Sequence, residues 1–171
     1  MTKYILIILP RDFKIYYSEN VDDSYIDSVI NKLKEVYGLN FRIVGLRIPR
    51  HEAKGVLEGT YDGRKLLQNM LLDGISLFLW IIDAPISVEG NLVYGYAKAL
   101  KGAIITTNAI EYPALVAKLA IHYVGVIIGL THCNNKCVMR NIDCFQELID
   151  LPSTLCQTCT LRYRKIKYRF Q

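Results

Sequence analysis

Four of the five cysteines form two closely spaced pairs near the C-terminal end of the sequence. Cys133 and Cys137 have three residues between them, Cys156 and Cys159 have two, and eighteen residues separate the pairs. Each short loop allows two thiolates to reach one metal ion, and two such pairs complete a tetrahedral zinc site. Four thiolates select zinc or an iron–sulfur cluster, and nothing else in the sequence indicates electron transfer. We therefore predict one structural Zn2+ with these four ligands.

The fifth cysteine is not part of either pair. Cys144 lies between the pairs, and we expect a buried core thiol rather than a ligand, because unpaired cysteine is among the most buried residue types. The competing interpretation is four unrelated reduced thiols, which the paired spacing disfavours. A zinc ion would order a loop-rich segment that buries little apolar surface by itself.

A longer pattern surrounds the first cysteine pair. Residues 122–139 read HYVGVIIGLTHCNNKCVM. This run is similar to the archaemetzincin signature, H-E-x-x-H-x-x-G-x-x-H-C, then a second cysteine close to methionine and a distant C-x-x-C. Upstream, VYGYA at 93–97 and GAIIT at 102–106 resemble the family's edge strand and the strand that leads into its active-site helix. The resemblance spans residues 75–160.

The resemblance implies a role for each matching position. His122 and His132 match histidine ligands of a catalytic zinc, Gly129 matches the turn after the helix, and Met139 matches the methionine beneath the metal. In the family, a glutamate between the first two histidines is the general base for a zinc-bound water. The family activity is therefore zinc-dependent peptide hydrolysis.

Two positions depart from the family signature. Val126 stands where the second histidine is expected, and its side chain has no lone pair to offer a metal. Tyr123 stands where the glutamate is expected, and a phenol with a pKa near 10 is a poor base at neutral pH. A catalytic zinc normally takes three protein ligands and a water molecule. The resemblance therefore implies an archaemetzincin-like zinc-binding protein without catalytic zinc or peptidase activity.

Other interpretations of these residues stay open. An active zinc metallopeptidase would need replacement ligands from elsewhere in the chain. His122 on an apolar helix is more often a hydrogen-bonded core histidine than a ligand. His132 would also suit a zinc site of three cysteines and one histidine. The HEAKG run at 51–55 begins like a zinc motif, but its fifth position is glycine, so we interpret it as a solvated loop.

An α/β domain must position these residues. Hydrophobic patterning predicts strands separated by amphipathic helices, and the first strand–helix–strand unit is expected to be a parallel crossover. The predicted strands cover 4–9, 41–48, 76–82, 91–94 and 103–107, and the predicted helices cover 22–37, 62–74, 111–130 and 143–149. Lys118 and His122 interrupt the apolar helix at 111–130, which favours a buried central helix over a membrane span.

The expected architecture follows from these elements and the resemblance. The fold class is α/β, with a metzincin-like mixed twisted sheet, backing and active-site helices, and a small zinc-bound C-terminal subdomain. We expect one domain over 1–171, divided into an α/β part at 1–130 and a cysteine-rich part with a basic tail at 131–171. With 51% hydrophobic and 22% charged residues, the composition excludes a disordered chain.

The formal charge of +5 lies entirely in the last eleven residues. They contain five cations and no acid, which leaves 16 basic and 16 acidic residues in the rest of the chain. Tyr163, Tyr168 and Phe170 alternate with these cations, a mixture that occurs in nucleic-acid-binding segments. The neutral body offers no continuing basic surface, so we favour a final strand or extension packed on the body, or a frayed terminus. A nucleic-acid-binding module that uses the tail is the less favoured alternative.

Partners and location complete the expectations. A peptide or protein in the vestigial cleft is the partner that the resemblance suggests, and no membrane contact is expected. The apolar run at 4–9 is too short for a secretion signal. We therefore expect a cytoplasmic protein, in which thiols stay reduced and available to a metal.

Overall fold

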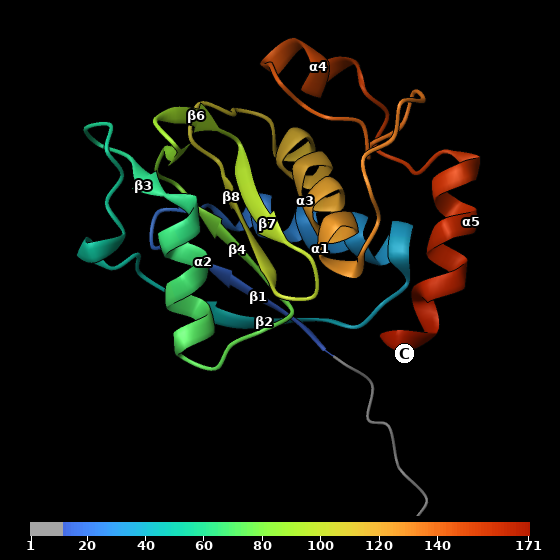
Figure 1. Ribbon diagram of the computed structural model, residues 1–171, viewed down its shortest axis with the longest axis horizontal. Helices are drawn as coiled ribbons and strands as arrows, with labels where there is room; N and C mark the ends of the chain where they lie inside the picture. Colours follow the sequence, from blue (N-terminus) through green and yellow to red (C-terminus); the bar gives the residue numbers. More distant parts are fainter. Residues whose placement is uncertain (1–11) are drawn as a thin grey trace, which may run out of the picture.

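A five-stranded mixed sheet lies at the centre of the computed structural model, which describes residues 12–171 (Figure 1). The strand order is β2-β1-β4-β8-β7; the first four strands are parallel, and β7 pairs antiparallel with β8 at one edge. The strands are β1 (Phe13–Tyr17), β2 (Phe41–Leu46), β4 (Phe78–Ile82), β7 (Gly95–Lys98) and β8 (Gly102–Thr106). The mixed sheet that the sequence predicts is confirmed.

The first strand of this sheet was not predicted. β1 precedes the first helix, whereas the strand predicted at 4–9 lies outside the described residues. β1 pairs with β2 in parallel, so the predicted strand–helix–strand crossover is confirmed with β1 as its first member. The run at 4–9 is more strongly apolar, so it was predicted as the strand. Phe13–Tyr17 was missed because Lys14 interrupts its apolar residues.

Helices cover both faces of the sheet. α1 (Asp23–Tyr37) and α3 (Pro113–Ile128) lie on one face, and α2 (Gly63–Leu72) lies on the other (Figure 1). Alternate strand residues supply the two cores: Leu79 packs toward α1 and α3, and Trp80 packs toward α2. The period of two along the strands therefore builds a three-layer structure.

Local signals explain where the first two helices begin and end. The Asp22 carboxylate accepts a hydrogen bond from the Ser24 N–H at the start of α1, and Asp62 does the same for Arg64 in α2. α1 ends at Gly38, whose φ of 57° is a left-handed conformation that glycine adopts without a steric penalty. These boundaries agree with the sequence prediction.

The apolar helix α3 is buried, as predicted. It lies between the sheet, α1 and the C-terminal segment, and most of its side chains belong to the larger core. Its 16 residues begin at Pro113, a residue suited to the first helical turn. Within residues 12–171, no helix has both the length and the apolar character required to cross a membrane.

A small second sheet lies beside the main one. It contains β3 (Tyr61–Asp62), β5 (Ile86–Val88) and β6 (Asn91–Val93), and β6 forms its edge. The strand predicted at 91–94 is therefore an edge strand of this sheet, and the chain passes from it directly into β7.

The C-terminal segment contains α4 (Phe145–Asp150), α5 (Gln157–Ile166) and the short 3-10 helix η2 (Lys167–Arg169). The basic tail is thus helical rather than a final strand or a frayed terminus. The Tyr163 hydroxyl donates to the Tyr37 carbonyl, and the Phe170 ring centroid lies 5.6 Å from that of Phe13. The segment shares the core formed by α1 and α3. Its separation as a subdomain at residue 131 stays a prediction.

Candidate metal centre

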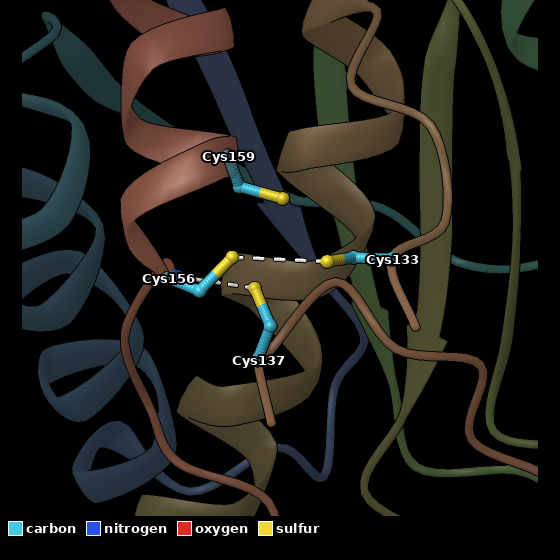
Figure 2. A group of neighbouring side chains, drawn as sticks. All are labelled: Cys133, Cys137, Cys156 and Cys159. Atoms are coloured by element: carbon cyan, nitrogen blue, oxygen red, sulfur yellow. Dashed lines mark hydrogen bonds between the residues drawn. The ribbon is translucent and has the colours of Figure 1, made fainter. Parts of the chain in front are cut away.

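The four predicted cysteine ligands lie together at the C-terminal end of the chain. Cys133 and Cys137 lie in the loop after α3, Cys156 is the residue before α5, and Cys159 is in the first turn of α5 (Figure 2). Their sulfur atoms all lie within 4.8 Å of one another, and the Sγ atoms of Cys133 and Cys156 are 3.7 Å apart.

These separations fit one tetrahedral metal ion. Zn–S bonds of about 2.3 Å place two sulfurs roughly 3.8 Å apart in a tetrahedral site. A disulfide would require about 2.05 Å, and all four thiols are free. His132 is not part of this cluster. The arrangement therefore fits a structural zinc with four cysteine ligands better than a site with three cysteines and one histidine.

Hydrogen-bond donors around the sulfurs favour the thiolate form. The backbone N–H groups of Cys156 and Met139 lie 3.2 and 3.5 Å from the Cys137 Sγ. The backbone N–H of Cys159 is the largest influence that lowers the pKa of Cys156, to about 6. Cys156 also stands at the N-terminus of α5, where the helix dipole stabilises a negative charge. Thiolate is the form that binds zinc.

Burial has the opposite effect on two of the thiols. Cys137 and Cys159 are fully buried, and burial raises the pKa of both side chains. Several buried thiolates are stable only when a cation balances their charge. A divalent ion supplies that charge and deprotonates the thiols it binds. The donor set therefore fits Zn2+ in both geometry and chemistry.

A second group of polar side chains lies where α3 meets the edge strand β7. The buried His122 Nδ1 is 2.8 Å from the Val138 carbonyl oxygen, so Nδ1 carries the proton and donates. Burial lowers the pKa of His122, which favours the neutral imidazole. The exposed His132 ring stacks on it, with centroids 5.5 Å apart and planes 23° apart. The structure thus brings together the two histidines that match family ligands.

Tyr123 lies at the position of the family's general base, and its hydroxyl faces the sheet edge. The Tyr123 Oη donates to the Gly95 carbonyl oxygen at 3.0 Å. Its ring packs so closely on β7 that a Cβ at Gly95 would lie 2.7 Å from the ring. Burial raises the pKa of Tyr123 further above its ordinary value. The phenol is therefore even less suited to accept a proton at neutral pH than its residue type suggests.

A catalytic zinc does not fit the residues around this pair. Val126 lines a pocket of about 210 Å³ together with His122 and His132, on the side where the family's second histidine would stand. Within residues 12–171, the four cysteines are the only close group of three or more His, Cys, Asp or Glu side chains. Residues 1–11 contain none of these four residue types. No third ligand of these types joins the two histidines.

The turn and methionine positions of the family signature take the expected places. Gly129, with a φ of 97°, ends α3 in a left-handed conformation and turns the chain toward His132. Met139 is fully buried beneath α3 and packs against Gly125. The scaffold around the family's metal site is therefore retained in this chain.

Gly125 provides a test of this packing. A Cβ at Gly125 would clash with Met139 and lie 2.9 Å from the Tyr37 hydroxyl oxygen. We expect Gly125→Ala to destabilise the protein by about 1–3 kcal/mol through overpacking, although alanine favours a helix by about 1 kcal/mol. Urea unfolding measures the difference. An unchanged or increased free energy of unfolding would contradict this expectation and show that the Met139 side chain moves aside at little cost.

Sequence reasoning missed the role of Lys118. Lys118 interrupts the apolar pattern of α3, and its hydrogen-bond partners lie 30 and 31 residues away in the sequence. The buried Nζ donates to the carbonyl oxygens of Leu148 at 2.6 Å and Ile149 at 2.9 Å, at the end of α4. Burial lowers the pKa of this lysine. Lys118 therefore connects α4, which lies between the two cysteine pairs, to α3.

Two other predictions have clear outcomes. Cys144 is exposed rather than a core thiol, because it is the residue before α4 and lies in a surface turn; the prediction of burial was wrong. It is not part of the cysteine cluster. The solvated loop predicted at 51–55 contains a single 3-10 turn, His51–Ala53, in which His51 is exposed.

Sequence comparisons relate this chain to known proteins. The model for peptidase family M54 matches residues 94–165. An archaemetzincin from Nanoarchaeum equitans is 30% identical over 156 residues, covering 89% of this chain and 88% of that protein. An archaemetzincin from Archaeoglobus fulgidus is 26% identical over 161 residues, covering 88% and 99%.

Solved structures agree in fold. The Archaeoglobus fulgidus archaemetzincin, in complex with malonate, superposes with a TM-score of 0.76 at 23% identity, covering 87% of this chain and 99% of that one. The Methanopyrus kandleri archaemetzincin gives 0.78 at 20% identity, covering 94% and 96%. The matches extend over nearly the whole of each relative. The four-cysteine cluster, the histidine and glycine positions around α3 and these similarities lead to one conclusion: the chain belongs to the archaemetzincin family, peptidase family M54.

Proposed function

We propose that this protein is a zinc-binding archaemetzincin homologue that keeps one structural Zn2+ and does not hydrolyse peptides. The observation that carries the proposal is Val126, one helical turn after His122 in the pocket that the two histidines line. Within residues 12–171, no third His, Cys, Asp or Glu forms a metal-binding group with His122 and His132, so the pair falls short of the three ligands that a catalytic zinc needs.

The state of Tyr123 supports the same proposal. A general base must reach the proton that it removes and have a pKa near the working pH. The Tyr123 hydroxyl is engaged with the Gly95 carbonyl oxygen, and burial moves its pKa away from neutrality. Val126 thus impairs metal binding, and Tyr123 impairs water activation. Replacing one of the two residues would not restore the function that depends on the other.

The cleft itself supports a binding role. Its pocket between β7 and α3 persists, and the exposed side chains of His132 and Asn141 line it. No strand pairs with the outer edge of β7 in the described part of the chain. We propose a peptide or protein as the ligand that this cleft binds without cleaving. We also propose a cytoplasmic location, because four closely spaced free thiols suit a reducing compartment.

Zinc content and peptide cleavage test the proposal together. Elemental analysis of the purified full chain is expected to give one zinc per molecule, and His122→Ala or His132→Ala should leave this value unchanged. Incubation with an unstructured peptide library and added zinc should give no cleavage by mass spectrometry. Two zincs per chain, with loss of one in His132→Ala and chelator-sensitive cleavage, would instead establish an active metallopeptidase.

A further inference from the structure

The C-terminal helix has one buried face and one charged face. Cys159, Tyr163 and Phe170 are buried against the body of the protein. Arg162, Arg164, Lys165, Tyr168 and Arg169 are exposed, and we call these five residues the α5 basic face. Arg164 and Lys165 lie in the last turn of α5, and Tyr168 and Arg169 follow them directly in the short 3-10 helix η2. The apolar residues of the tail therefore pack on the body, as one of the sequence interpretations expected, and the cations of the α5 basic face stay in solvent.

The cations of the basic face have no acidic partners in the described structure. Ion pairs within residues 12–171 join body residues only, such as Arg47 with Asp73 and Arg64 with Glu89. The last acid in the sequence is Asp150, and residues 1–11 contain none. The net charge of the chain is therefore concentrated and unpaired on this helix.

Two structural roles account for only part of this charge. Four thiolates and one Zn2+ would carry about −2 charges, of which Arg162 can offset part because it lies within a turn of Cys159. Arg169 follows Cys159 by ten residues and lies in η2, which puts it roughly 15 Å from Cys159 and beyond the Debye length of about 8 Å at physiological salt. The Lys167 Nζ lies 3.6 Å from the Cβ position of Gly38, at the C-terminus of α1, where a cation is favourable. Arg164 and Lys165 lie in the last turn of α5, where a cation is also favourable, but they and Arg169 have no acidic partner and stay exposed to solvent.

An aromatic ring lies among these free cations. The Tyr168 side chain is 67% exposed, and the Arg169 guanidinium lies over its ring at 5.8 Å from the centroid. An exposed tyrosine of this kind can stack on a base with its free face. A membrane surface fits less well, because the apolar side of the helix is already buried against the core and only Leu161 and Tyr168 remain to insert.

We propose that the α5 basic face binds single-stranded nucleic acid, with Arg164, Lys165 and Arg169 on phosphates and Tyr168 stacked on one base. The rest of the chain has no net charge and offers no second basic surface. The contact is therefore limited to the α5 basic face and to a few phosphates. Each phosphate contact contributes about −0.7 to the slope of log affinity against log salt for a single strand. Three contacts therefore predict a slope of about −2.

Fluorescence anisotropy with the zinc-loaded full chain and a labelled single strand of ~20 nucleotides of mixed sequence tests this surface. Affinity should fall roughly 20-fold between about 50 and 200 mM salt. Arg164→Gln with Lys165→Gln should weaken binding at low salt and reduce the slope to about −0.7. The matched control, Lys54→Gln with Lys65→Gln, removes the same charge near α2 on the other side of the sheet and should leave the slope unchanged.

The tyrosine separates nucleic acid from other polyanions. Tyr168→Ala should weaken binding about tenfold, whereas Tyr168→Phe should retain it, because stacking uses the ring and not the hydroxyl. The same protein should bind anionic vesicles and polyglutamate more weakly than the oligonucleotide. Absence of binding at low salt, an equal effect of the control variant, or equal affinity for polyglutamate with no effect of Tyr168→Ala would each overturn the proposal.

Discussion

Cys137→Ser is expected to remove the zinc and to disorder the segment that follows α3. The Cys137 sulfur is fully buried, accepts two backbone N–H groups and lies in a cluster that joins the loop after α3 to the start of α5. A serine hydroxyl stays protonated at neutral pH and is a poor zinc ligand. Thiolate zinc sites in small domains contribute about 10–16 kcal/mol of apparent binding free energy. This substitution should therefore have the largest effect on stability of those considered.

Elemental analysis and thermal unfolding measure this effect. We expect less than one zinc per chain and a large decrease in Tm, with loss of helical circular dichroism from α4 and α5. Cys144→Ser is the matched control, because Cys144 is exposed and lies outside the cluster; it should retain both zinc and Tm. Full zinc occupancy with an unchanged Tm in Cys137→Ser would contradict the four-cysteine site.

Placing the histidine of the family signature at position 126 is expected to create a second zinc site. Val126 lies four residues after His122 on α3, and the pocket that it lines also contains His132. Val126→His therefore supplies a third histidine in the pocket that His122 and His132 already line, and zinc content should rise from about one to about two per chain. The retained positions of Gly129 and Met139 support a preserved scaffold.

The general base can be restored separately. Tyr123→Glu alone should add no zinc, because position 123 matches the general base of the family signature and not a zinc ligand. It should also lower stability, because it removes the hydrogen bond to Gly95 and places a carboxylate in a buried site. Val126→His with Tyr123→Glu should give both a second zinc and measurable peptide cleavage.

A distant histidine controls for nonspecific metal binding. Leu72→His on the exposed side of α2 adds the same residue far from the pocket, and zinc content should stay at about one per chain. If Val126→His also stays at one zinc under saturating metal, the pocket does not have the geometry of a family metal site. The proposal that Val126 explains the loss of catalysis would then fail.

The sequence by itself determined features that depend on neighbouring residues. The caps of α1 at Asp22 and Gly38 lie within a few residues of the helix they stop, so their effect is local. The two cysteine pairs are short loops whose spacing already restricts the sulfurs to one ion. Every residue of β4 and β8 is buried, and the continuous apolar runs at these positions are typical of central strands covered on both faces.

Only the tertiary structure decided which residues far apart in the sequence form hydrogen bonds with each other. The hydrogen bonds from Tyr123 to Gly95, from Lys118 to Leu148 and from Tyr163 to Tyr37 span 28, 30 and 126 residues. Sequence spacing carries no information about such partners, because they meet only after the sheet and helices have packed. For the same reason the Tyr123 hydroxyl, recognised in the sequence as a poor base, proved in the structure to be bound to the edge strand. The surface position of Cys144 and the helical basic tail were likewise set by how the C-terminal segment packs on α1 and α3.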